Sequence, residues 1–200
     1  MYNYNKKVLV TTSLDKTLIM WQVLKKHSYH FEQLQKLLGF FAPVTQIRQL
    51  KEQGVVITGD QKGELILWDF LKSKILYAFR GQHNSQILSI DLMGPNKFLV
   101  ASSDNTISIW KTKPKPATDL VDLCVCEKII SDNFNGIASL HYISAEVVML
   151  GTLEGMFKLY DLAKKFTIHQ LQVHSERALE LVFDNNLIVS LGADNTLVFL

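Results

Sequence analysis

Apolar and polar positions alternate along this chain in a plan that is repeated several times. Each repeat has a short apolar run, a small polar turn, and then a stretch in which apolar and polar residues alternate up to a large, usually aromatic, residue. The clearest examples run from Val8 to Trp21 and from Phe98 to Trp110. Such alternation is typical of strands, and Asp, Asn, Gly and Ser in the turns suit tight hairpins. The pattern therefore predicts an all-β chain.

The large residues that close these stretches recur at a regular interval. They stand about 40 to 50 residues apart, at Trp21, Trp68, Trp110, Tyr160 and Leu200. Self-similarity at such a period indicates a repeat architecture in which each repeat is one supersecondary unit. We expect one domain over residues 1–200, with units at roughly 1–39, 40–80, 81–131, 132–172 and 173–200.

The turn and closing strand of each unit resemble the WD-repeat β-propeller family. The shared pattern is Ser-x-Asp-x-Thr-apolar-x-apolar-Trp, and the units that end at Trp21 and Trp110 match it at every position. The other units keep part of the pattern. The landmark residues are Asp15, Trp21, Trp68, Asp69, Tyr160, Asp161, His174 and Asp194. The resemblance implies about four to five blades, each of four antiparallel strands lettered a to d from the axis outward.

The same resemblance implies a structural tetrad of His83, Ser102, Asp104 and Trp110. In such a tetrad a carboxylate accepts a hydrogen bond from the imidazole, and a hydroxyl links the ring to the indole N–H, so each buried polar group is satisfied. His, Ser and Asp together also suggest a hydrolase triad. However, the spacing repeats with the blade, and the chain has no Gly-x-Ser-x-Gly sequence that would expose a nucleophile. We therefore expect no catalytic residues and no enzyme activity.

The two ends of the chain differ from the middle of the repeat. The first unit has room for only a stub of strand a near Tyr2, and the fifth reaches Leu200 at the close of its strand c. We expect an incomplete arc of a larger propeller, whose remaining blades are missing or supplied by another chain. A closed ring of five blades is the alternative.

The composition indicates a folded protein without strong electrostatic character. Hydrophobic residues make up 48% and charged residues 20%, and the formal net charge is +2. These values exclude a disordered chain and give no footprint for nucleic acid or a membrane surface. No apolar run is long enough for a signal peptide or a membrane span. We expect the protein in the cytoplasm, with the nucleus as the alternative.

The two cysteines, Cys124 and Cys126, would share one face of a strand. A zinc site would need two further ligands nearby, and the neighbouring sequence offers none. Free cysteines usually pack as small buried apolar residues. We therefore expect two free thiols, no metal and no cofactor.

The loops between blades carry candidate partner-binding residues. In this family, the loops from strand d to the next strand a share one face with the turns between strands b and c, and that face contacts partner peptides. Here these loops contain Phe40, Phe41, Phe134 and Arg177. Aromatic residues and arginine are enriched in interface hot spots, although the phenylalanines could pack between blades instead. We expect a non-catalytic scaffold that presents this face to partner proteins.

The sequence also offers two alternatives to the scaffold function. The basic loop between strands c and d of the third unit, with Lys111, Lys113 and Lys115, is an alternative site for RNA, a phosphorylated ligand or a lipid head group. The near-neutral net charge argues against nucleic acid. An enzyme with a site in the central channel would need convergent acids or histidines on the a strands. Those strands offer only Arg48, Asp91, His141 and Glu180.

Overall fold

The described residues of this chain form five small antiparallel sheets, and each sheet is one blade. The computed structural model describes residues 2–3, 8–25, 29–50, 55–69, 72–113, 124–144, 146–184 and 187–200. Blade 1 contains β1 (Tyr2–Asn3), β2 (Val8–Thr12), β3 (Leu18–Lys25) and β4 (Tyr29–Leu37). Blade 2 contains β5 (Val44–Leu50), β6 (Val55–Asp60), β7 (Leu65–Asp69) and β8 (Lys74–Phe79). Blade 3 contains β9 (Ile87–Gly94), β10 (Lys97–Ser102), β11 (Thr106–Thr112) and β12 (Cys124–Ser131). Blade 4 contains β13 (Ile137–Ser144), β14 (Val147–Thr152), β15 (Met156–Asp161) and β16 (Phe166–Gln172). Blade 5 contains β17 (Ala178–Asp184), β18 (Leu187–Gly192) and β19 (Leu197–Phe199).

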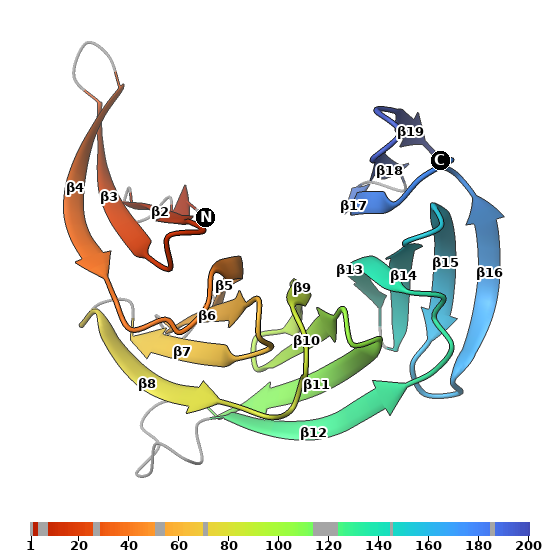
Figure 1. The fold of residues 1–200 in the computed structure, drawn as a ribbon, viewed down its shortest axis with the longest axis horizontal. Coiled ribbons are helices and arrows are strands. Elements are labelled where there is room, and N and C mark those ends of the chain that lie inside the picture. Colours follow the sequence, from red (N-terminus) through yellow and green to blue (C-terminus); the bar gives the residue numbers. More distant parts are fainter. Residues whose placement is uncertain are drawn as a thin grey trace.

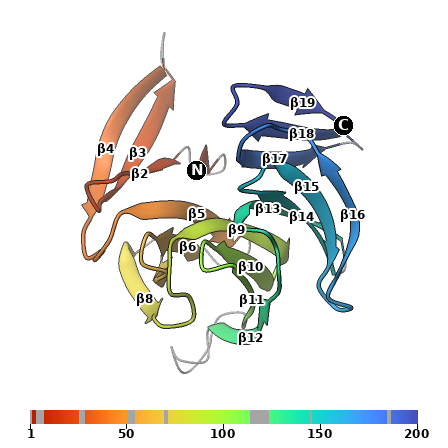
Figure 2. The same cartoon turned by 45° about the vertical axis from the view of Figure 1, so that its right-hand side comes forward.

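The blades follow one another around a common axis, as Figures 1 and 2 show. In blades 2 to 4 the first strand lies nearest the axis and the fourth lies outermost (Figure 1). Packing joins each blade to the next in chain order, mainly through β5, β9, β13 and β17. The described residues of blades 1 and 5 show no comparable packing against each other, and in Figure 1 these blades flank the open side of the arc. The expected all-β propeller is confirmed, and its completion by further blades stays a prediction.

The turn between the second and third strands has the same backbone shape in all five blades. One residue of each turn has a positive φ, and these residues are Lys16, Gly63, Asn105, Gly155 and Asn195. Asn and Gly tolerate this left-handed conformation better than other residues. The polar turn residues seen in the sequence thus fold each pair of strands into a tight hairpin.

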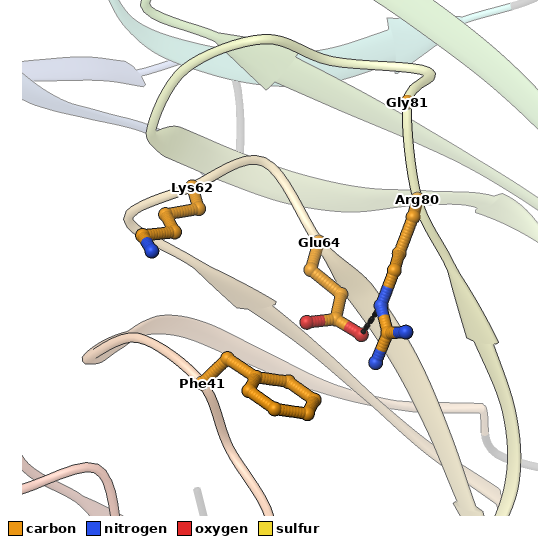
Figure 3. A pocket seen from close by; sticks show the side chains of 5 residues that line it. All are labelled: Phe41, Lys62, Glu64, Arg80 and Gly81. Atoms are coloured by element: carbon orange, nitrogen blue, oxygen red, sulfur yellow. Dashed lines mark hydrogen bonds and ion pairs between the residues drawn. The ribbon is translucent and has the colours of Figure 1, made fainter.

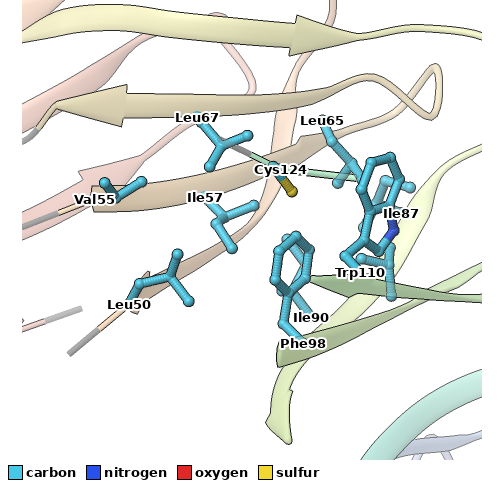
Figure 4. Close-up of a cluster of buried hydrophobic side chains, with 11 residues drawn as sticks. Leu50, Val55, Ile57, Leu65, Leu67, Ile87, Ile90, Phe98, Trp110 and Cys124 are labelled. Carbon is cyan, nitrogen blue, oxygen red and sulfur yellow. The ribbon is translucent and has the colours of Figure 1, made fainter. Parts of the chain in front are cut away.

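The hydrophobic core lies between neighbouring blades. Figure 4 shows the cluster between blades 2 and 3, in which Ile57 and Leu65 of blade 2 meet Ile87 and Phe98 of blade 3. Trp110 is fully buried there, with its ring parallel to that of Phe98 at a centroid distance of 5.9 Å. Since each blade buries its faces against its neighbours, the arc is stabilised blade by blade.

The two cysteines are free thiols, as expected from their surroundings in the sequence. Cys124 is buried in the core between blades 2 and 3, and Cys126 is half-buried. Burial raises the pKa of Cys124 to about 12, so this thiol is unreactive at neutral pH. No group of three or more acidic, His or Cys side chains within the described ranges could hold a metal ion. In the same ranges, no helix is long and apolar enough to cross a membrane.

Gly155→Ala is expected to destabilise the protein far more than Gly81→Ala. Both glycines have positive φ, +79° and +83°. A Cβ at Gly155 would lie 2.3 Å from the carbonyl oxygens of His174 and Glu176, whereas a Cβ at Gly81 would meet nothing within 4 Å. We expect a loss of about 1 kcal/mol for Gly81→Ala from backbone strain alone, and at least about twice that for Gly155→Ala. Urea denaturation of both variants measures the difference, and equal losses would contradict the close approach of these loops.

Candidate functional site

A hydrogen-bonded chain of polar side chains ties the loop before blade 3 to its central hairpin. Trp110 Nε1 donates to Ser108 Oγ at 2.6 Å, and Ser108 Oγ lies 2.7 Å from His83 Nε2. On the other side of the ring, His83 Nδ1 lies 2.9 Å from Thr106 Oγ1, which donates to Asp104 Oδ1 at 2.6 Å. A neutral imidazole with its proton on Nδ1 satisfies every group in this chain.

The family resemblance implies Ser102 as the linking hydroxyl, but in the structure Ser108 has this role. Ser102 Oγ donates to the Ser85 carbonyl at 3.1 Å and accepts from the Asp104 backbone N–H at 3.2 Å. Ser102 therefore shapes the turn, while Ser108 on β11 links the imidazole to the indole. Thr106 completes the set, which contains His83, Asp104, Thr106, Ser108 and Trp110 and is called the His83 network below.

Blade 5 builds the same arrangement from a different strand. His174 Nδ1 lies 2.8 Å from Thr196 Oγ1, and Thr196 Oγ1 donates to Asp194 Oδ1 at 2.7 Å. His174 Nε2 lies 2.8 Å from Ser190 Oγ. Ser190 belongs to β18 and is paired with Val198 on β19. The hydroxyl thus comes from the second strand of blade 5, whereas Ser108 lies on the third strand of blade 3. Blade 5 also has Leu200 in place of the tryptophan.

The electrostatics of the His83 network match a structural role. Burial lowers the pKa of His83, and the neighbouring Asp104 raises it only in part. Burial raises the pKa of Asp104, but hydrogen bonds from Thr106 and from the Asn84 backbone N–H outweigh this effect, so the net pKa lies below its ordinary value. Both ring nitrogens of His83 are already hydrogen bonded. The imidazole is thus neutral, buried and occupied, which leaves it no free nitrogen for a substrate.

The remaining landmark aromatic residues are also held by hydrogen bonds. Trp21 Nε1 donates to Thr11 Oγ1 at 2.9 Å, and Trp68 Nε1 donates to Thr58 Oγ1 at 3.1 Å. The Tyr160 hydroxyl donates to the Asp132 carboxylate.

The landmark aspartates cap turns. Asp15 Oδ1 accepts from the backbone N–H and the hydroxyl of Thr17. Asp69 Oδ1 accepts from the Lys72 N–H. Asp161 Oδ1 accepts from the N–H groups of Ala163 and Lys164. These residues therefore hold the turns of the propeller in place.

Blade 2 keeps the hairpin of blade 3 but lacks its network. The β6–β7 register pairs Thr58 with Ile66, just as β10–β11 pairs Val100 with Ser108. When the two blades are aligned on their tryptophans, Lys62 stands at the position of Asp104, Glu64 at that of Thr106 and Ile66 at that of Ser108. The loop before this blade supplies phenylalanines instead of a histidine.

A pocket of about 340 Å³ opens at this place (Figure 3), and its lining residues are Phe41, Lys62, Glu64, Arg80 and Gly81. Arg80 Nε lies 2.7 Å from Glu64 Oε1, and the Arg80 guanidinium carbon lies 4.9 Å from the centre of the Phe41 ring. The Glu64 side chain is 8% exposed and that of Arg80 is 63% exposed. Sequence reasoning named only Phe41 of this group. Comparing blade 2 with blade 3 position by position was the signal that could have found Lys62 and Glu64.

The other candidate partner-binding residues lie in contrasting places. Phe40 is buried against Trp68, with 5.0 Å between ring centroids, and Phe134 is buried edge-on to Tyr160. These two phenylalanines pack between blades, so their side chains are not available to a partner.

The charged candidates are more accessible than these two phenylalanines. Arg177 is half-buried, and its Nε is enclosed without a hydrogen-bond partner in the described part of the chain. Lys111 and Lys113 are exposed, and Lys115 lies outside the described residues.

A second, more polar pocket of about 250 Å³ lies at the inner strands. Asp91 Oδ2 lies 3.1 Å from His141 Nδ1 and accepts from the Tyr142 backbone N–H at 2.8 Å. Arg48 and Glu180 also line this pocket. The four candidates for a channel enzyme are thus neighbours, but the carboxylate nearest to His141 is already used to join β9 to β13.

Comparison with known proteins supports the propeller. Residues 73–111 match the family described as WD domain, G-beta repeat. The chain is 21% identical over 199 residues to Autophagy-related protein 16 of Arabidopsis thaliana, covering 98% of this chain and 36% of the relative. It is 26% identical over 155 residues to WD repeat-containing protein srw1 of Schizosaccharomyces pombe, covering 74% and 26%. It is 30% identical over 82 residues to Dynein axonemal assembly factor 10 of Dictyostelium discoideum, covering 40% and 23%.

The chain therefore spans between about a quarter and about a third of the length of these relatives. Among solved structures, the WD40 β-propeller domain of Doa1 superimposes with a TM-score of 0.77 at 22% identity, covering 100% of this chain and 62% of that one. With the His83 network, five hairpin blades and this match, the chain carries a WD40 repeat and has the WD-repeat β-propeller fold.

Proposed function

We propose that this chain is a non-catalytic scaffold that binds partner proteins on its loop face. The loop face comprises the turns between the second and third strands of each blade and the segments that connect one blade to the next. WD40 propeller relatives fit an interaction-scaffold role, and fold alone does not assign a partner. The observation that carries the proposal is the exposed aromatic ring of Phe41 beside the exposed guanidinium of Arg80.

This pair has the character of an interface hot spot. Phe41 is 61% exposed. Burial of this apolar ring against a partner protein would therefore be favourable. Aromatic residues and arginine dominate the binding energy of many protein interfaces.

The free thiols Cys124 and Cys126 favour a reducing compartment, so we propose the cytoplasm, with the nucleus as the alternative.

The alternative site for RNA, a phosphorylated ligand or a lipid head group has weaker support. Lys111 and Lys113 are exposed, but they do not form an isolated basic patch. Glu127 lies 2.8 Å from Lys97, and the hydrogen bond from Lys97, together with the charges of Lys97 and Lys111, lowers the pKa of Glu127. This carboxylate offsets part of the positive potential that a phosphate ligand would need.

Phe41→Ser is expected to remove the main partners of this chain, whereas Phe166→Ser is not. Phe166 is a matched control because it is 47% exposed and lies on β16, the outer strand of blade 4. Quantitative affinity capture should show at least about a tenfold loss of specifically bound proteins for Phe41→Ser, with unchanged thermal unfolding. The loop face would be refuted as the binding surface if both variants captured the same amount of partner proteins, or if Phe166→Ser lost more of them than Phe41→Ser.

A further inference from the structure

We propose that the pocket beside Phe41 binds a carboxylate side chain of an extended partner segment, whose apolar neighbour packs on the Phe41 ring. This inference rests on the proposed function, because it names the partner chemistry of one part of the loop face. It commits to an acidic peptide segment of another protein. The pocket is lined by Phe41, Lys62, Glu64, Arg80 and Gly81 and is shown in Figure 3.

The pocket lies in blade 2 at the place where blades 3 and 5 have their histidine networks. In blade 3, His83, Thr106 and Asp104 occupy the space between the hairpin turn and the preceding loop. In blade 2, Gly63 keeps the positive φ of the turn, so the hairpin has the same shape. Lys62 replaces the aspartate, which reverses the charge at that position. Phe41 stands at the position of His83 when the two tryptophans are aligned, and its ring is exposed, whereas the neighbouring Phe40 packs against Trp68.

Arg80 is anchored at its Nε, which leaves the end of its guanidinium open to an anion. Its Nε is bonded to the almost buried Glu64 carboxylate, and its guanidinium lies over the Phe41 ring. The two terminal nitrogens of Arg80 have no further partner among the described residues. A guanidinium anchored by Nε presents these nitrogens as a fork, which matches the two oxygens of a carboxylate. Holding the fork in advance lowers the entropy lost on binding.

The charges in the pocket match a single negative charge. Lys62 and Arg80 are cationic and Glu64 is anionic, so the residues that line the pocket carry a formal excess of one positive charge. The buried carboxylate of Asp60 lies behind the turn, where its Oδ1 accepts hydrogen bonds from the N–H groups of Lys62 and Glu64, and it adds to the repulsion of a second negative charge. A carboxylate neutralises this excess. A phosphate carries about −1.5 to −2 at neutral pH, so it would leave uncompensated negative charge close to Glu64. The structure thus favours an Asp or Glu side chain over a phosphorylated residue.

The rim of the pocket can accommodate a peptide backbone with an apolar side chain. Gly81 lies at the rim, and a side chain built there would meet no atom within 4 Å. The Phe41 ring provides an apolar surface next to the two cations. A partner segment with an acidic residue one or two positions from an apolar residue would therefore use both parts of the pocket.

The test uses peptides as probes of this chain. A display library of short random peptides is selected on the wild-type protein. The tightest binder is then synthesised with its acidic residue kept, replaced by the amide, or replaced by phosphoserine. Fluorescence anisotropy gives Kd for each peptide with the wild type and with Arg80→Gln, Lys62→Gln and Lys74→Gln. Lys74 is the matched control, since it is an exposed lysine of the same blade outside the pocket.

We expect the selected peptides to pair Asp or Glu with a nearby apolar residue. Replacing the acid by the amide, or Arg80 by Gln, should weaken binding about tenfold or more, because a charge-assisted bond is lost. Lys62→Gln should weaken it about threefold, and Lys74→Gln should leave it unchanged. Because Arg80→Gln also leaves Glu64 without its partner, Lys62→Gln provides the variant whose folding should be unaffected.

Three results would overturn the pocket assignment. They are a library that yields no binder, binders that ignore Arg80 and Lys62, and a phosphoserine peptide that binds more tightly than its glutamate form. None of these results bears on the Phe41→Ser affinity capture, which tests the loop face as a whole. If capture also fails to depend on Phe41, the proposed function fails as well, so the two failures are distinguishable.

Discussion

Trp110→Ala is expected to lower the free energy of unfolding by about 3–5 kcal/mol. Trp110 is fully buried between blades 2 and 3, parallel to Phe98 and edge-on to Phe79 with 4.8 Å between ring centroids. Truncation leaves a cavity that the rigid sheets cannot close, and it removes the indole N–H from Ser108. Urea denaturation followed by circular dichroism measures the loss.

Two further variants separate the causes of this loss. Trp110→Phe keeps most of the packing but removes the hydrogen bond to Ser108, so a loss of about 1–2 kcal/mol is expected. Trp21→Ala serves as the control, because Trp21 is the equivalent landmark of blade 1 but is only half-buried. It should cost about 1–2 kcal/mol. A loss for Trp21→Ala as large as that for Trp110→Ala would contradict the inter-blade core as the main source of stability.

His83→Ala is expected to cost about 2–4 kcal/mol, since it leaves a cavity and removes partners from buried hydroxyl groups. His83 is almost fully buried, and Ser108 and Thr106 each lose a bond to its ring. Thermal and urea unfolding measure the cost. His141→Ala is the control, because His141 is more exposed and lies at the inner strands instead of between the loop and the hairpin. Comparable losses for both would refute the structural role of the His83 network.

The pH dependence of the free energy of unfolding gives a second test of the role of His83. Because burial lowers the pKa of folded His83, the unfolded chain binds a proton below about pH 6.5 that the folded chain does not. The free energy of unfolding should therefore fall as pH drops from about 6.5 toward the lower folded pKa. His83→Ala should flatten the profile in this window. The pKa values of the Asp104 and Asp194 carboxylates are also lowered. Their protonation changes the free energy of unfolding only below about pH 4.

Most of the fold could be predicted from the sequence because it depends on local patterns. Alternation of apolar residues and polar turns locates the hairpins, and residues such as Asn105 and Asn195 occupy the positive-φ positions of the turns. The landmark Trp, Tyr and Asp residues give the repeat its phase. These features each involve residues close together in the chain, so the physical cause can be read from a single stretch.

The network and the pocket were harder to predict because they depend on register across strands. Ser102 and Ser108 both stand near the turn, and only the strand pairing shows which hydroxyl faces the histidine. Similarly, Phe40 and Phe41 are adjacent, but one packs on Trp68 and the other is exposed. Arg80 joins the pocket from the next connecting segment, which no local pattern links to Lys62 or Glu64.

The exchange of the serine between strands has a consequence for how such repeats are detected. In blade 3 Ser108 is paired with Val100 across the two strands, and in blade 5 Ser190 is paired with Val198. A profile that treats each position separately expects the serine at one position and not at its partner, and the family match covers residues 73–111. A profile written for pairs of facing positions, in which either member of a pair supplies the hydroxyl, would score both blades alike. Degenerate repeats in other chains should become visible to such a pairwise profile.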